Sequence, residues 1–167
     1  MKKLIIISGT MGAGKTTVCN ELLKDLSKSV FLDGDWCWNM NPFVVTEETK
    51  TMVIDNITHL LKNFLICSEY EYVIFCWVMH QETIFEDILN RLSDVEFKPH
   101  KITLMLSKEA LQDRLLKDIS NNVRTHDIIE RSIQRLELYE KMNTVKIDVS
   151  LKSPREVAKE IIQYIGG

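Results

Sequence analysis

Glycine and proline are scarce in this sequence, with six and three residues among 167. That scarcity excludes collagen-like chains and disordered chains rich in these two residues. The sequence also lacks a basic excess, because its formal net charge is −3, and this argues against a general nucleic-acid binder. No apolar run approaches the roughly 20 residues of a membrane span, so we expect neither nucleic acid nor a membrane as a partner.

The cysteines show no C-x-x-C spacing, so neither a zinc site nor a redox motif is indicated. There are four of them, Cys19, Cys37, Cys67 and Cys76. They are too few for a disulfide-dense scaffold, which favours reduced thiols in a cytoplasmic protein. The apolar stretch 4–7 near the N-terminus is too short for the core of a signal peptide, which agrees with a cytoplasmic location.

Apolar strand-like segments alternate with amphipathic helical segments along the sequence. Strands are expected at 4–7, 30–32, 72–78, 102–106 and 145–149. Helices are expected at 15–27, 47–68, 82–93, 108–119 and 125–142, with a last helix from Pro154. Strands that are apolar throughout are typical of a parallel sheet covered by helices on both faces. We therefore predict an α/β protein with one domain over 1–167.

Two helix starts are marked by capping residues. Thr46 is the expected N-cap of the helix over 47–68, whose first turn carries two glutamates at the positive end of the helix dipole. Ser153 and Glu156 form a Ser-x-x-Glu capping box, with Pro154 at the first helical position. These signals fix where both helices should begin.

The segment 9–16 fits the phosphate-loop pattern G-x-x-x-x-G-K-[ST], and it leaves a predicted strand and opens a predicted helix. Its backbone N–H groups and the positive end of the helix would bind phosphate. Lys15 would reach the β- and γ-phosphates, and the Thr16 hydroxyl would bind Mg²⁺. The alternative is a glycine turn that happens to contain Lys-Thr. The residues predicted to bind the nucleotide are Gly9, Met11, Gly12, Ala13, Gly14, Lys15, Thr16 and Thr17.

The second predicted strand ends in Asp33-Gly34-Asp35. Together with the phosphate loop, this pattern resembles the P-loop NTPase superfamily, and within it the small-molecule kinases similar to shikimate kinase, gluconate kinase and nucleoside monophosphate kinases. The GTPase motifs N-K-x-D and D-x-x-G are absent, and the apolar runs 72–79 and 102–106 do not end in the acid usual for motor and transport ATPases. The resemblance implies a three-layer α/β/α fold with a five-stranded parallel sheet in the order 2-3-1-4-5.

The resemblance also implies roles for the two aspartates. Asp33 would lie near the γ-phosphate, where it would hold Mg²⁺ through water or accept the proton of an attacking hydroxyl. Asp35 would bind the acceptor hydroxyl, and either residue could be the base. The alternative is that Asp-Gly-Asp is simply a turn.

Kinases of this group carry arginines on and beside a mobile lid, and the resemblance implies a short lid near 114–126. Arg114 and Arg124 would neutralise charge on the transferring phosphoryl group as catalytic residues. Arg131 and Arg135 continue the series along the next helix, although such a stripe is also typical of a solvated helix face.

The resemblance places the acceptor between the end of the second strand, the helices that follow it and the end of the third strand. Trp36 and Trp38 could stack on an acceptor ring or close a small core under their loop. His80 could orient a hydroxyl or lie at the edge of the core. The motifs that nucleoside monophosphate kinases and shikimate kinase carry after the third strand are absent, so neither substrate transfers to this chain.

We predict an ATP-dependent phosphotransferase that uses Mg²⁺ and transfers the γ-phosphate to a small molecule. Candidate acceptors are sugar acids, nucleosides or nucleotides, and antibiotics of the chloramphenicol or tunicamycin type. The alternative is a non-catalytic or regulatory ATP-binding protein. The expected partner is the small-molecule acceptor alone, with the protein a monomer or a homodimer.

Overall fold

The computed structural model describes residues 1–121 and 127–166. Its strands are β1 (Lys2–Ser8), β2 (Ser29–Asp33), β3 (Tyr72–Cys76), β4 (Phe97–Met105) and β5 (Val145–Asp148). Its α-helices are α1 (Lys15–Asp25), α2 (Glu47–Ile66), α3 (Glu82–Arg91), α4 (Lys108–Ser120), α5 (Asp127–Glu140) and α6 (Pro154–Ile165), and a short 3-10 helix, η1, covers Gly34–Trp38. None of the helices in the described ranges combines the length and hydrophobicity of a membrane span.

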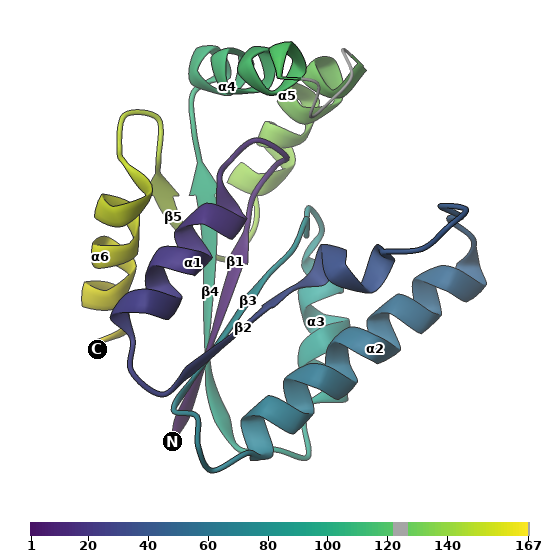
Figure 1. Ribbon diagram of the computed structural model, residues 1–167, viewed down its shortest axis with the longest axis vertical. Helices are drawn as coiled ribbons and strands as arrows, with labels where there is room; N and C mark the ends of the chain where they lie inside the picture. Colours follow the sequence, from purple (N-terminus) through teal and green to yellow (C-terminus); the bar gives the residue numbers. More distant parts are fainter. Residues whose placement is uncertain (122–126, 167) are drawn as a thin grey trace.

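The five strands form one parallel sheet in the order β2-β3-β1-β4-β5, which confirms the predicted fold class and strand order. Helices α1 and α6 cover one face and α2 and α3 cover the other, while α4 and α5 lie across the end of the sheet where β1 and β4 finish (Figure 1). Because β1 lies in the middle, Ile5 and Ile7 pack into one core, and Leu4 and Ile6 pack into the other. This double burial explains why the strand is apolar at every position.

Most elements begin or end within two residues of their predicted bounds, and three differences have a clear cause in the structure. Strand β3 ends at Cys76, two residues early, because the chain leaves the sheet once the Trp77 N–H has donated to the Ile7 carbonyl at 3.2 Å. Strand β4 begins at Phe97, five residues early, and its first half pairs with β1 alone because β5 begins opposite Ile102. A strand segment without a second neighbour tolerates proline and charged residues. The first half of β4 contains both, so the sequence did not look like a strand there. Residues 34–38, where the sequence showed no helical period, form η1.

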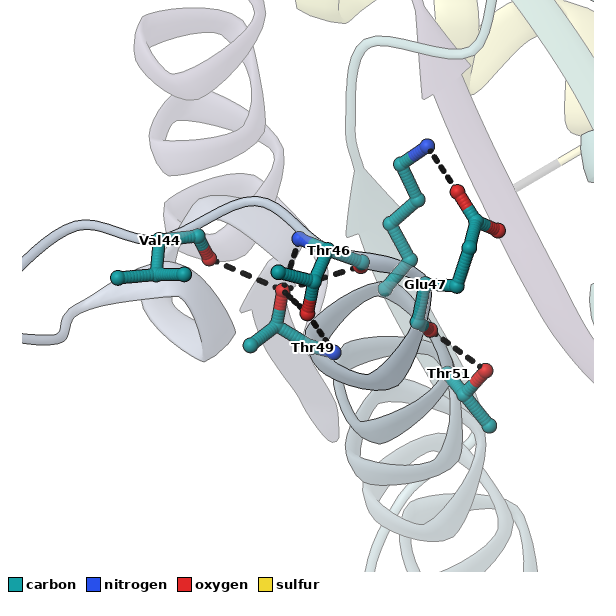
Figure 2. Close-up of polar contacts among 6 residues, drawn as sticks. Val44, Thr46, Glu47, Thr49 and Thr51 are labelled. Atoms are coloured by element: carbon teal, nitrogen blue, oxygen red, sulfur yellow. Dashed lines mark hydrogen bonds and ion pairs between the residues drawn. The ribbon is translucent and has the colours of Figure 1, made fainter.

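The capping predictions are confirmed. The Thr46 hydroxyl accepts from the Thr49 N–H at 3.2 Å, and the Thr49 hydroxyl accepts from the Thr46 N–H at 2.8 Å and donates to the Val44 carbonyl at 2.9 Å (Figure 2). The Ser153 and Glu156 capping box holds the start of α6 in the same way. The cap on α2 fixes the direction in which this helix enters the molecule, and its first turns border a groove described below.

Tyr139 on α5 carries a hydroxyl that is costly to bury. The side chain is 0% exposed, and within residues 1–121 and 127–166 its hydroxyl has no hydrogen-bond partner. Burial also raises the pKa of this phenol. We expect Tyr139→Phe to raise the free energy of unfolding by about 1 kcal/mol, because it removes an unsatisfied polar group and keeps the ring.

Urea denaturation monitored by circular dichroism checks this expectation. The matched control is Tyr164→Phe, because the Tyr164 side chain is 48% exposed and its hydroxyl can bond to water. The control should leave the denaturation midpoint unchanged. A lower midpoint for Tyr139→Phe would show that the buried hydroxyl contributes a hydrogen bond to the folded state.

Candidate active site

The loop between β1 and α1 leaves the start of the helix open to an anion. Gly14 is the N-cap residue of α1 and has a left-handed backbone with φ 87°, a conformation that favours glycine. No side chain caps this helix end and no acidic residue lies in its first turn. The first N–H groups of α1 and the positive end of its dipole are therefore available to a phosphate.

Lys15 folds back over the loop. Its ammonium donates to the Gly9 carbonyl at 3.0 Å and to the Thr10 carbonyl at 3.1 Å. The Thr10 hydroxyl in turn donates to the Ser132 carbonyl of α5 at 3.0 Å, so the far side of the loop is held by that helix. The ammonium thus lies at the mouth of the loop, where it can exchange two carbonyls for phosphate oxygens.

Asp33 connects the phosphate loop to the end of β2. Its Oδ2 accepts a hydrogen bond from the Thr16 hydroxyl at 2.7 Å, and its Oδ1 accepts from the Asp35 N–H at 3.0 Å. The second bond makes Asp33 the N-cap of η1, which fixes the carboxylate at the end of the strand. The side chain is buried, whereas Asp35 is exposed. The strand register explains why Asp33 meets Thr16. In the parallel sheet, β2 and β3 end at the same side as β1, and the phosphate loop follows β1.

These groups line one cavity of about 630 Å³. Met11 through Thr17 form its floor, Asp33 and Asp35 lie on one wall, and Arg114 lies on another. The Arg114 guanidinium donates to the Ala13 carbonyl at 3.2 Å and to the Val149 carbonyl, so it links α4 to both the loop and the end of β5. The cavity has the size of typical small-molecule sites.

The structure brings most of the predicted nucleotide and metal residues together with Asp35, but it leaves the other predicted acceptor residues, Trp36, Trp38 and His80, outside this cavity. Gly9 does not line the cavity and contributes its carbonyl to Lys15 instead. Trp36 is 57% exposed and packs edge-on against Phe31 at 5.4 Å between ring centroids. Trp38 packs against Phe43 at 5.8 Å and lies outside this cavity.

His80 also lies outside the cavity, in the segment between β3 and α3. Burial and the neighbouring Arg135 lower its pKa, and within residues 1–121 and 127–166 its buried Nδ1 has no hydrogen-bond partner. The predicted catalytic residue Arg124 falls outside the described residues. Arg131 is exposed on α5, as a solvated helix face would place it.

Sequence reasoning missed several residues of the cavity wall. Lys117 and Asp118 follow Arg114 by three and four residues on α4, so helical spacing from the arginine could have found them. Lys152 comes from the loop after β5, and Pro154 is the first residue of α6. Lys152 pairs with Glu160 at 2.6 Å.

Comparison with known proteins places this arrangement among solved structures. The tunicamycin resistance protein of Deinococcus radiodurans aligns with a TM-score of 0.74 at 18% identity, over 99% of this chain and 96% of that one. A gluconokinase from Sinorhizobium meliloti aligns with a TM-score of 0.71 at 15% identity, over 98% of this chain and 91% of that one. The shikimate kinase of Acinetobacter baumannii, solved in complex with shikimate, aligns with a TM-score of 0.68 at 20% identity, over 99% of this chain and 93% of that one. These similarities show a common fold.

The sequence comparisons give a family but no close relative. No curated protein matches the sequence. A family model described as an AAA domain matches residues 5–144, which include the phosphate loop, both aspartates and Arg114. The chain therefore belongs to this AAA domain family, and its fold is that of the P-loop kinase-like group.

Proposed function

We propose that the protein is an ATP-dependent kinase that transfers the γ-phosphate of ATP to a hydroxyl group of a small molecule. The observation that supports this most strongly is the single cavity that joins the phosphate loop, the Thr16–Asp33 pair, Asp35 and Arg114. The names of two structural neighbours, a gluconokinase and a shikimate kinase, agree with this reaction class.

Each part of the cavity has a role in the proposal. The uncapped N–H groups of α1 bind the phosphates, and Lys15 leaves its two backbone carbonyls to bind the β- and γ-phosphate oxygens. Arg114 supplies a second positive charge near the loop. Phosphoryl transfer requires positioning and charge stabilisation more than covalent chemistry by the protein, and these groups provide both.

The residues at the loop fit Mg²⁺. The Thr16 hydroxyl and the Asp33 carboxylate are 2.7 Å apart, and both are hard oxygen donors of the kind that Mg²⁺ prefers. In the proposed complex they would hold the ion together with phosphate oxygens. Bound there, Mg²⁺ would neutralise charge on the β- and γ-phosphates.

The geometry favours a division of labour between the two aspartates. Both oxygens of Asp33 already accept hydrogen bonds, from Thr16 and from the Asp35 N–H, and its position beside Thr16 suits a metal partner. Asp35 is exposed on the wall of the same cavity, where a bound hydroxyl can reach it. We assign the general base to Asp35 and the metal contact to Asp33.

The proposal includes one kinase domain over 1–167 with a short lid near 114–126, in which Arg114 and Arg124 would approach the transferring phosphate. Arg114 already lies at the cavity. Residues 122–126 lie outside the described part of the chain, so the role of Arg124 rests on the sequence.

An assay of ADP release across a panel of acceptors tests the proposal. The panel holds sugar acids, nucleosides, nucleotides and hydroxyl-bearing antibiotics, each tested with and without Mg²⁺. We expect ADP release that depends on one class of acceptor, with a phosphorylated product visible by mass spectrometry. ATP binding without acceptor-dependent ADP release across the whole panel would contradict the kinase and favour a regulatory ATP-binding protein.

A further inference from the structure

A second cavity, of about 330 Å³, lies between the first turns of α2, the start of α3 and the segment after β3. We call it the aromatic groove. It is lined by Trp38, Lys50, Ile54, Trp77, Thr83, Ile84 and Asp87. Both tryptophans and both isoleucines are half-buried and lean on the core beneath α2 and α3. The groove therefore presents flat indole rings and branched aliphatic side chains to solvent.

The aromatic groove adjoins the phosphate cavity through two short segments. Val78 lines the phosphate cavity and Trp77 lines the groove, although the two residues are consecutive. Gly34 separates Asp33 from Asp35, and a Cβ on it would come within 2.6 Å of Trp77 Cγ. The Trp77 indole thus lies directly against the backbone between the two aspartates, which is possible only because residue 34 has no side chain. The backbone between Asp33 and Asp35 is therefore in contact with a residue that lines the groove.

The charges at the groove are already balanced. Lys50 pairs with Glu47 at 2.8 Å on α2, and Glu47 is drawn with this contact in Figure 2. Asp87 belongs to a second pair, with Arg91 at 2.9 Å on α3. Each charged lining residue thus has an opposite charge on its own helix. Because both pairs are largely exposed, breaking one costs little, but an anionic ligand in the groove would find no unmatched cation among the lining residues and would lie beside the Asp87 carboxylate.

From this we infer that the phosphoryl acceptor is an uncharged molecule with an aromatic or flat apolar body and a hydroxyl group. Its body lies between Trp38 and Trp77, and its hydroxyl lies toward Asp35. The inference rests on the proposed kinase function and narrows its acceptor class. It excludes sugar acids and nucleoside monophosphates, which carry a carboxylate or a phosphate into a site without an unmatched positive charge.

Isothermal titration calorimetry of the full chain, saturated with a non-hydrolysable ATP analogue and Mg²⁺, tests the inference. The uncharged aromatic probes are chloramphenicol and uridine, and the anionic probes are uridine monophosphate and gluconate. Uridine and its monophosphate form a matched pair that differs by the phosphate alone. We expect at least one uncharged probe to bind, with uridine monophosphate at least tenfold weaker than uridine.

Variants then locate the binding site. Trp77→Leu and Trp38→Leu should each weaken binding of the uncharged probe by about tenfold, because each removes an aromatic ring on which the probe stacks. Trp77→Phe should retain most of the affinity because it keeps a ring. The matched control is Trp36→Leu, because this tryptophan is exposed and lines neither cavity. Lys50→Ala should change the affinity by less than twofold. Thermal unfolding checks that each variant is folded.

The outcomes separate the acceptor class from the kinase activity. Tighter binding of gluconate or uridine monophosphate, lost in Lys50→Ala, would overturn the acceptor class and leave the kinase intact. Equal effects of Trp77→Leu and Trp36→Leu, or no binding of either uncharged probe, would also overturn it. Binding at Trp77 without phosphorylation of any probe would instead count against the kinase and leave the groove a site for uncharged aromatic ligands.

Discussion

Replacing Lys15 by alanine should lower the kcat for phosphoryl transfer by roughly 100- to 1,000-fold, the range typical for removing one transition-state charge contact. The ammonium lies at the mouth of the phosphate loop, held by the Gly9 and Thr10 carbonyls, and in the proposed reaction it moves to the β- and γ-phosphates. Without it, negative charge that develops between these phosphates loses its nearest fixed cation. The measurement is kcat for ADP release at saturating acceptor.

The fold should survive this change, because the Lys15 ammonium bonds to the Gly9 and Thr10 carbonyls at an open cavity rather than within the core. Lys24→Ala is the matched control. Lys24 lies in the last turn of the same helix, where its ammonium pairs with Glu21 at 2.6 Å. The control should retain full kcat. A Lys15→Ala protein as active as the parent would show that the loop does not bind the transferring phosphate.

Changing Asp33 to asparagine should lower turnover by roughly 10- to 100-fold and raise the Mg²⁺ concentration needed for half-maximal activity. Asparagine keeps the shape of the side chain, and its oxygen can still accept from either Thr16 or the Asp35 N–H. Asparagine is also a good N-cap residue, so η1 should remain formed. The change therefore removes a charge beside the proposed metal and little else. A magnesium titration of initial rates provides the measurement.

Two further variants are needed to interpret the magnesium titration of Asp33→Asn. Asp25→Asn, at the exposed end of α1 away from the loop, should behave as the parent protein does. Asp35→Asn should lower kcat while the Mg²⁺ requirement stays unchanged, because this residue is the proposed base rather than the metal partner. If Asp33→Asn keeps both its turnover and its Mg²⁺ requirement, the assignment of Asp33 to the metal is wrong.

The sequence alone predicted the strands of a parallel sheet and the position of the phosphate loop, because both depend on short-range signals, whereas the strand order came from the resemblance to P-loop kinases. Buried parallel strands are apolar at every position, and the loop pattern specifies its own strand before and helix after. Asp33 could be placed for the same reason, as the first polar residue after an apolar strand. These features need no knowledge of residues distant in the sequence.

The parts that escaped prediction depend on contacts across the chain. Nothing in the sequence indicated that the Arg114 guanidinium donates to the carbonyls of Ala13 and Val149, which lie 101 and 35 residues away. The end of β3 at Cys76 decides that Trp77 faces the aromatic groove and Val78 the phosphate cavity.

The place of β1 in the sheet has a consequence for how such an enzyme can change. The phosphate loop follows the central strand, whereas the proposed acceptor contacts follow β2 and β3 toward one edge. Substitutions around Trp38 and Trp77 therefore alter the periphery and leave the loop supported by strands on both of its sides. In the proposed enzyme, the acceptor can therefore change through substitutions beside β2 and β3, while the residues that bind the nucleotide stay the same.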